Sequence, residues 1–221
     1  MSFKKDKYCV IKNAISNEVA QFIFNYFLMK RQVLQTMVSR NMISPFDRTW
    51  GQLQDDQVPD TFAHYADVAM ETLLLKLLPE MEKHTEEKLI PTYSYARIYK
   101  KGDVLERHKD RESCEISTTL FLGGDKWPIY LSPYENVGKT KDGFKYASEA
   151  KGKSINLEQG DMLVYSGCEL EHWREKFDGQ DCAQVFLHYN RDTKENQNRL
   201  YDCRPHVGLP AIFKEDLYPN K

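Results

Sequence analysis

The sequence lacks the features of a membrane-bound or secreted protein. No apolar run is long enough to cross a bilayer, and the first six residues contain no apolar segment of a secretion signal. The five cysteines are an odd, scattered set without a Cys-x-x-Cys pair, which is typical of reduced thiols. These absences predict a cytoplasmic protein without a membrane partner.

The chain also lacks a strong charge of either sign. Its 221 residues carry a formal net charge of −2, and the sequence pI is near 6.3. This balance does not indicate binding to nucleic acid or to an anionic membrane surface. An apolar content of 41% over this length is sufficient for a single domain, 1–221, with a sizeable core.

Apolar residues in the first part of the chain recur with helical spacing. They repeat at three and four residues in one segment: Val19, Phe22, Ile23, Tyr26 and Phe27. Ser16 is a plausible N-cap for this helix. A second helix is predicted from about Thr61, with an interruption at Pro79, and residues 39–60 are interpreted as a loop. We expect residues 1–90 to form a helical support.

From Leu89 onward the pattern changes to that of short strands. Segments rich in β-forming residues alternate with turn signals at 93–99, 114–122, 128–132, 154–157, 161–165 and 183–189. Such a series is typical of a sandwich or a jelly roll, and the N-terminal helices would cover one sheet. We expect the core to span 91–190 and a tail to span 191–221. The polar segment 134–153 is interpreted as a hairpin or lid.

Two histidines and an aspartate are the candidate metal ligands. His108 and Asp110 are two residues apart, so both side chains point the same way on an extended segment. His172 supplies a second imidazole from a later strand. Two imidazoles and one carboxylate, with other positions open, is the arrangement of non-haem Fe(II) oxygenases. His-x-Asp alone also fits a surface histidine beside a capping aspartate.

The residues around these ligands resemble a known family. Tyr-x-x-Gly-x-x-Leu-x-x-His-x-Asp at 99–110 is similar to a motif of the prolyl-4-hydroxylase-like branch of the 2-oxoglutarate- and Fe(II)-dependent oxygenases. Residues 117–122 and 159–165 resemble the strands that lead from this motif to the distal histidine, here His172. The resemblance covers roughly residues 93–190. It implies a mainly β fold with α (α+β), a double-stranded β-helix (jelly roll) with N-terminal helices packed on one sheet.

The resemblance also implies an enzyme, a 2-oxoglutarate/Fe(II)-dependent dioxygenase. It would couple decarboxylation of 2-oxoglutarate to hydroxylation of an unactivated C–H bond, with Fe(II) held by His108, Asp110 and His172 as catalytic ligands. O2 and an ascorbate-type reductant are implied. The substrate would be a residue of a peptide or protein, or a small molecule, because family membership does not choose among them.

The chain departs from the family at the anchor for 2-oxoglutarate. The family usually holds the far carboxylate with an Arg or Lys about ten residues after the distal histidine, but residues 181–184 contain no base. We predict Arg174 as the substitute, because it lies two residues after His172 and an Arg fork grips a carboxylate with two bonds. Tyr99 would add a hydroxyl donor, as the matching family tyrosine does; otherwise it is a half-buried strand aromatic.

Other interpretations stay open at this point. Arg174 also fits an ion pair in solvent with Glu171 or Glu175, and Arg97 and Arg191 are weaker candidates for the anchor. A cupin-like metal-binding protein without oxygenase turnover would use the same three ligands, and the missing base favours it. A zinc hydrolase would need a general base beside the metal and a His-Glu-x-x-His type motif, which is absent.

The remaining histidines are given ordinary interpretations. His64 and His84 lie in predicted helices and are treated as non-ligands. His188 lies on a predicted strand, where it is either a group that supports the site or a satisfied core histidine. We prefer the second interpretation.

Overall fold

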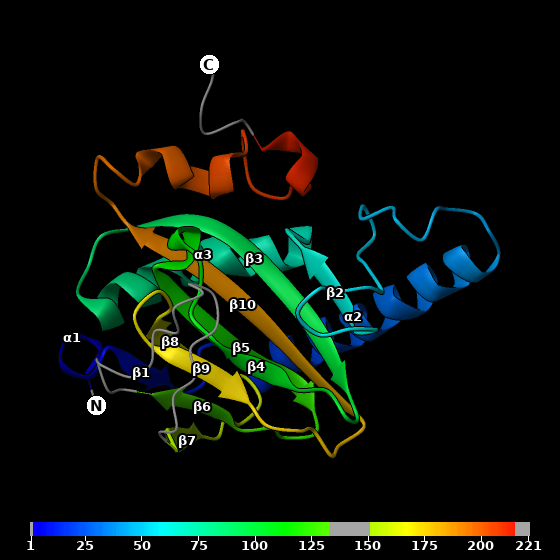
Figure 1. Ribbon diagram of the computed structural model, residues 1–221. Helices are drawn as coiled ribbons and strands as arrows, with labels where there is room; N and C mark the ends of the chain where they lie inside the picture. The colour runs from blue at the N-terminus through cyan, green and yellow to red at the C-terminus, as the bar shows by residue number, and fades with distance from the viewer. Residues whose placement is uncertain (1, 133–150, 215–221) are drawn as a thin grey trace, which may run out of the picture.

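Two antiparallel β-sheets face one another in the protein (Figure 1), whose computed structural model describes residues 2–132 and 151–214. The larger sheet consists, in spatial order, of β1 (Tyr8–Ile11), β8 (Met162–Ser166), β5 (Ile116–Gly124), β10 (Asp181–Arg191), β3 (Leu89–Lys100) and β2 (Phe62–Tyr65). The smaller sheet consists of β4 (Leu105–His108), β9 (Glu171–Arg174), β6 (Ile129–Ser132) and β7 (Lys153–Ile155). We call the space between the two sheets the barrel interior.

Helices cover the other face of the larger sheet (Figure 1). The α-helices are α1 (Phe3–Asp6), α2 (Asn17–Ser39) and α3 (Val68–Thr85), and the 3-10 helices are η1 (Glu112–Cys114), η2 (Gln197–Cys203) and η3 (Ala211–Phe213). Helix α2 begins as the sequence predicts, because the Ser16 hydroxyl accepts a hydrogen bond from the Val19 N–H at 3.3 Å. This arrangement is the predicted α+β class.

The second helix begins later than the sequence pattern indicates. A helix from Thr61 was a wrong prediction, because residues 62–65 form strand β2 and pair with β3. Helix α3 begins only after Asp67, whose carboxylate accepts hydrogen bonds from the N–H groups of Ala69 and Met70 at 2.9 and 3.3 Å. Charged acceptors at an N-cap fix the start of a helix strongly.

Pro79 also does not interrupt the helix as predicted. It lies inside α3, which runs to Thr85. A proline removes one backbone hydrogen bond from a helix. Leu77 and Met81 on either side are fully buried, and their packing against the sheet holds α3 together across this position.

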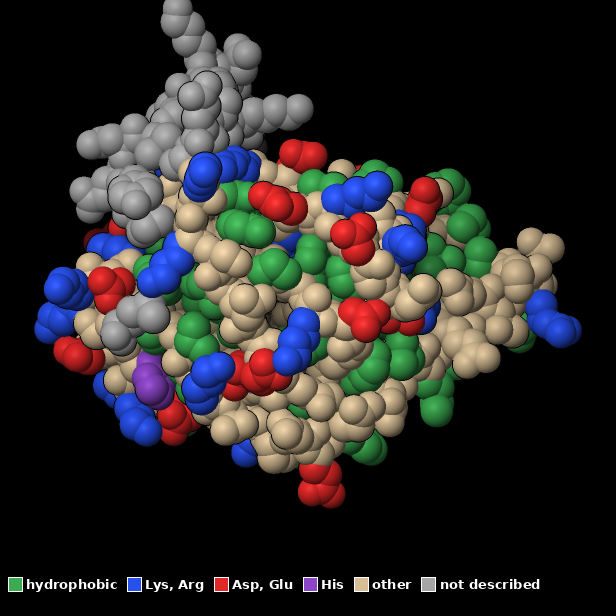
Figure 2. Space-filling model, turned by 90° about the horizontal axis from the view of Figure 1, so that it is seen from below, with side chains coloured by type: hydrophobic (Ala, Val, Ile, Leu, Met, Phe, Trp, Pro, Cys, Tyr) green, Lys and Arg blue, Asp and Glu red, His purple; other side chains and the backbone are tan. Residues whose placement is uncertain are grey.

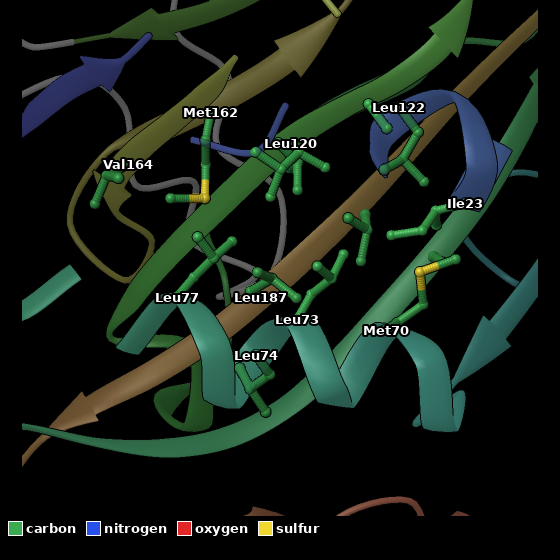
Figure 3. Close-up of a cluster of buried hydrophobic side chains, with 14 of the residues drawn as sticks. Ile23, Met70, Leu73, Leu74, Leu77, Leu120, Leu122, Met162, Val164 and Leu187 are labelled. Carbon is green, nitrogen blue, oxygen red and sulfur yellow. The ribbon is translucent and has the colours of Figure 1, made fainter. Parts of the chain in front are cut away.

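Strand alternation separates two cores on the larger sheet. The helix-side core receives Ala183, Val185 and Leu187 from β10, together with residues of α2 and α3 (Figure 3). Cys182 and Phe186, which point to the opposite face of β10, belong to a second core in the barrel interior, which both sheets line. Because side chains alternate along a strand, each long strand serves both cores.

On the face in Figure 2, acidic and basic side chains are interspersed with apolar ones. Within the described ranges, no helix has the length and apolar character needed to span a membrane. The predicted hairpin or lid at 134–153 lies almost wholly outside the described residues, and Lys153 begins β7. The division of the chain at residues 90 and 190 and the cytoplasmic location stay predictions.

Candidate active site

The three candidate metal ligands meet at the end of the smaller sheet. His108 on β4 pairs directly with His172 on β9, and their ring centroids are 4.2 Å apart. Asp110 Oδ1 lies 3.4 Å from Nε2 of His172 and 3.7 Å from Nε2 of His108. One ligand atom from each residue lies within 4.8 Å of the others. The structure therefore brings together the residues selected from the sequence, in a group that could hold a metal ion.

Both histidines are oriented to coordinate through Nε2. Nδ1 of His108 lies 2.7 Å from the carbonyl of Glu106, and Nδ1 of His172 lies 3.1 Å from the carbonyl of Leu170. A carbonyl only accepts, so Nδ1 carries the proton and Nε2 keeps its lone pair toward Asp110. Such a backbone contact fixes the tautomer and the ring direction of a metal ligand.

The charges of the group also suit a divalent cation. Burial, and then the neighbouring His172, lowers the pKa of His108 to about 4. Burial alone would raise the pKa of Asp110, but the neighbouring histidines, His172 first among them, together outweigh it and hold the pKa well below its usual range. At neutral pH the group therefore offers a carboxylate and an uncharged His108 imidazole, the protonation states that metal binding requires.

Arg174 lies in the barrel interior and not at the surface. Its side chain is fully buried, and it donates hydrogen bonds to the Trp127 carbonyl and, at 3.2 Å, to Thr119 Oγ1. No ion pair joins it to a carboxylate of the described residues, so the alternative pairing with Glu171 or Glu175 is absent there. Its Nε is buried without an acceptor among those residues. Arg174 is thus a buried cation without a counter-charge in the part of the chain that the structure describes.

Arg174 lies beside residues 181–184 of β10, which contain no Arg or Lys. Thr119 joins it to β10, because the Thr119 hydroxyl donates to Gln184 Oε1 at 2.9 Å. Burial raises the pKa of the Cys182 thiol, and the nearby Arg174 guanidinium partly opposes that shift. The basic side chain near Cys182 and Gln184 is therefore Arg174, which comes from β9 and not from β10.

The other candidate anchors already have acidic partners. Arg97 is buried and pairs with the Asp55 carboxylate at 2.9 Å. Arg191 pairs with Glu115 and Glu87 at the end of the sheet.

Tyr99 lies in the same interior as Arg174. It is fully buried, and its hydroxyl accepts a hydrogen bond from Arg97 Nη1 at 3.0 Å. The hydroxyl proton of Tyr99 is therefore free for another acceptor. Tyr99 is thus not a half-buried strand aromatic.

Sequence analysis did not select one residue that reaches the metal ligands. Nε2 of Gln57 lies 3.1 Å from Nε2 of His108, across 51 positions of sequence. Because His108 donates through Nδ1, the Gln57 amide is the donor here. Asp55 holds the turn by accepting hydrogen bonds from the N–H groups of Gln57 and Val58, both at 2.9 Å. A metal ion at Nε2 of His108 would replace the hydrogen bond from Gln57. No local sequence signal indicates the contact between Gln57 and His108.

A cavity of about 600 Å³ opens beside the metal ligands. His108, Asp110 and His172 line it, and Tyr93, Tyr95 and Phe186 are among the aromatic residues that face them. Its size and mixed lining are typical of a small-molecule site.

Two further histidines, His64 and His84, contact acidic residues other than Asp110, whereas His188 lies close to Asp110. His64 contacts Asp67 at 3.2 Å, and His84 lies 3.5 Å from Glu80. His188 is a buried histidine whose Nδ1 lies 3.0 Å from Ser117 Oγ, and burial lowers its pKa to about 4. Its partner Ser117 in turn contacts Asp110, so His188 is a buried histidine that is linked to the metal ligands.

Comparison with known proteins supports this architecture. No protein-family model and no curated protein matches the chain. AviO1 from Streptomyces viridochromogenes Tue57 superposes with a TM-score of 0.59 at 14% identity, covering 86% of this chain and 92% of that one. HygX from Streptomyces hygroscopicus, with nickel, 2-oxoglutarate and hygromycin B bound, gives 0.57 at 13% identity over 86% and 85%.

A viral enzyme has the same fold. The collagen prolyl hydroxylase vCPH of Paramecium Bursaria Chlorella virus-1, in its 2-oxoglutarate complex, gives a TM-score of 0.52 at 8% identity, covering 84% of this chain and 96% of that one. At these identities the similarity establishes the fold. The chain has the jelly-roll fold of 2-oxoglutarate/Fe(II) oxygenase structures, and the predicted fold class is confirmed.

Proposed function

We propose that the protein is a 2-oxoglutarate- and Fe(II)-dependent dioxygenase that hydroxylates an unactivated C–H bond, in the manner of a prolyl hydroxylase. The observation that carries this proposal is Arg174, a fully buried cation without a carboxylate partner among the described residues. A protein that only binds a metal needs the three ligands but has no use for this cation.

An uncompensated buried charge is costly, and binding of an anion removes much of that cost. 2-Oxoglutarate carries a second carboxylate at the end remote from its keto acid. We assign Arg174 and the Tyr99 hydroxyl to this carboxylate, because Arg97 and Arg191 are already neutralised by acids. The guanidinium offers its Nε and remaining N–H groups as donors.

The chain's residues would hold and shield the reactants. His108, Asp110 and His172 would bind Fe(II) through Nε2, Oδ1 and Nε2. The bound iron, with 2-oxoglutarate and O2, would supply the oxidising chemistry. The buried aromatic walls of the barrel interior exclude water from the cosubstrate, which strengthens its contact with Arg174.

The substrate class is left at two possibilities. The HygX structure contains hygromycin B, a small molecule, and vCPH is named as a collagen prolyl hydroxylase. A cavity of about 600 Å³ accommodates a small molecule or one residue of a peptide. An ascorbate-type reductant is proposed to keep the iron in its Fe(II) state.

A second candidate function is a metal-binding protein without oxygenase turnover. The contact between Gln57 and His108 Nε2 favours it, because this amide places a fourth protein group at the atom that faces the metal. If the Gln57 amide, once displaced from Nε2, coordinated the ion through its oxygen, it would reduce the open coordination positions.

Anaerobic addition of Fe(II) and 2-oxoglutarate distinguishes the two functions. We expect a weak visible charge-transfer band near roughly 500 nm for a chelate at an open site, and succinate formation once O2 and a substrate are supplied. If the wild type shows neither the charge-transfer band nor succinate formation, the result supports the metal-binding function instead.

A pair of matched variants tests the anchor. Arg174→Met should weaken 2-oxoglutarate binding by roughly 10–100-fold, the loss of a charged hydrogen-bonded contact. Arg191→Met should leave it unchanged, because Arg191 contacts Glu115 and Glu87 at the sheet end. Normal binding in Arg174→Met would show that the anchor is assigned wrongly even if the metal ligands are right.

A further inference from the structure

The two oxygens of the Asp110 carboxylate have different surroundings. Oδ1 faces the Nε2 atoms of His172 and His108 at 3.4 and 3.7 Å. Oδ2 points away from them and accepts a hydrogen bond from Ser117 Oγ at 2.6 Å. The Asp110 N–H also donates to the carbonyl of Gly167 at 2.9 Å. The carboxylate is therefore held from the side opposite the histidines.

The single hydroxyl proton of Ser117 decides the direction of the next contact. Ser117 Oγ lies 2.6 Å from Asp110 Oδ2, 3.1 Å from the Cys114 carbonyl and 3.0 Å from Nδ1 of His188. The short bond to a carboxylate is the strongest of these, so the proton points to Asp110. His188 must then donate from Nδ1 to the Ser117 oxygen. Strand register supports the contact, because Ser117 and His188 are opposite one another on β5 and β10.

A second metal site would be a rival explanation of this cluster. Asp110, Cys114 and His188 also place one potential ligand atom each within 4.8 Å of the others. However, the Ser117 hydroxyl already joins Asp110 to His188, and the Tyr93 hydroxyl lies 3.0 Å from Cys114 Sγ. Hydrogen bonds therefore account for all three groups without an ion.

We propose that Ser117 and His188 are positioning residues that restrict Asp110 to a single metal-facing oxygen, Oδ1. This inference rests on the proposed function. A carboxylate that turned both oxygens to the metal would occupy an additional coordination position. Tying Oδ2 to Ser117 keeps that position open, as three-ligand oxygenase sites require.

Gly167 provides an independent indication that the Asp110–Ser117 contact is tightly enclosed. A Cβ atom at Gly167 would lie 2.4 Å from each of Asp110 Oδ2, Ser117 Oγ and the Cys114 carbonyl oxygen. These distances are too short for any real contact, so something would have to shift. Gly167→Ala should therefore separate Asp110 from Ser117 without removing either hydrogen-bonding group.

Co(II) binding tests the positioning role without relying on turnover. Affinity is measured by calorimetry, and coordination by the visible absorption of Co(II), for the wild type, Ser117→Ala, His188→Leu, His188→Asn and Gly167→Ala. Loss of a group that orients a metal ligand should weaken Co(II) binding by roughly 10–100-fold in Ser117→Ala, His188→Leu and Gly167→Ala. Their spectra should shift as Asp110 engages both oxygens. The amide N–H of His188→Asn replaces Nδ1–H and should restore affinity and spectrum.

Thr118→Val is the matched control. Thr118 is the neighbouring buried hydroxyl on β5, but it accepts a hydrogen bond from the Leu187 N–H at 3.0 Å and does not contact Asp110. We expect wild-type affinity and spectrum in this variant. An equal loss in Thr118→Val, or a Ser117→Ala protein with wild-type affinity and spectrum, would overturn the positioning role alone. A wild type that binds no Co(II) would remove the proposed function together with this inference.

Discussion

The two faces of the larger sheet differ sharply in what they bury. On the helix side, β10 contributes Ala183, Val185 and Leu187 to a core of apolar residues (Figure 3). One residue away along the same strand, Gln184 and His188 face the barrel interior, and both are buried polar groups. The same strand therefore alternates apolar residues on the helix side with a mixture of polar and apolar residues on the interior side, and all of them are buried.

The difference teaches how the fold divides its tasks. Burial of apolar area on the helix side stabilises the chain, and this effect does not require a partner atom in a particular direction. The barrel interior instead holds polar groups whose contacts are complete only in part, such as Arg174. Proteins commonly break the rules of stable packing at functional sites and compensate elsewhere. We infer that the helix-side core compensates for the barrel interior.

The largest expected effect on stability comes from a substitution that creates a cavity in the helix-side core. Leu187 is fully buried there (Figure 3), and Leu187→Ala should lower the free energy of unfolding by about 2–5 kcal/mol in urea denaturation. Co(II) affinity of the folded variant should stay within about twofold of wild type, because the side chain points away from the site. Leu75→Ala, at a position 42% exposed, is the matched control and should cost far less. A large loss of Co(II) affinity in Leu187→Ala would show that the two faces are coupled.

A smaller, pH-dependent effect is expected at Asp67, also on the helix side. This buried carboxylate caps α3 and accepts hydrogen bonds from Tyr26 and Lys30. Burial alone would raise its pKa, but the contacts with His64 and Lys30 hold the pKa well below its usual range. Its contribution to stability is therefore complete above the unfolded pKa of about 3.9 and is lost as the pH falls through the lower folded pKa.

Asp67→Asn keeps a capping side chain but removes the charge. We expect it to lower the free energy of unfolding by about 1–2 kcal/mol at pH 7. Below about pH 4 the variant should lose less stability than the wild type, since it has no carboxylate to protonate. Urea denaturation at a series of pH values measures this, with Asp56→Asn in an exposed position as control. Parallel pH curves for wild type and Asp67→Asn would refute the assignment.

The residues predicted correctly to meet are those connected by short-range rules. His172 and Arg174 share a direction through strand alternation on β9. Asp110 lies two residues beyond the end of β4 at His108, and the two side chains still meet at the metal site. The family resemblance supplied the link between the two strands. The series of short β segments predicted a sandwich or a jelly roll, because alternation and turn residues are local properties of sequence. The family resemblance selected the jelly roll.

The features that sequence analysis missed depend on long-range contacts or on ambiguous local patterns. In β2, residues 62–65, the first three side chains are all buried although they point to alternate faces of the strand. The sequence there shows no alternation of apolar and polar residues that would distinguish a strand from a helix. Gln57 reaches His108 through an irregular loop, where no periodicity applies. Ser117 was not selected from the sequence, since its contact with His188 depends on the register of β5 against β10.

The smallest expected effect, and one of opposite sign, comes from Arg174. In Arg174→Met without ligand, the hydrogen bonds to the Trp127 carbonyl and Thr119 are lost, but a desolvated cation disappears. Removing such a charge for an apolar side chain should raise the free energy of unfolding by about 1 kcal/mol. With Co(II) and 2-oxoglutarate at 100 times its dissociation constant, the wild type should gain about 2.7 kcal/mol and the variant far less. Urea denaturation measures both values. A loss in Arg174→Met as large as that in Leu187→Ala would mean that the arginine stabilises the barrel as a structural residue, and the contrast between the two faces of the sheet would then no longer hold.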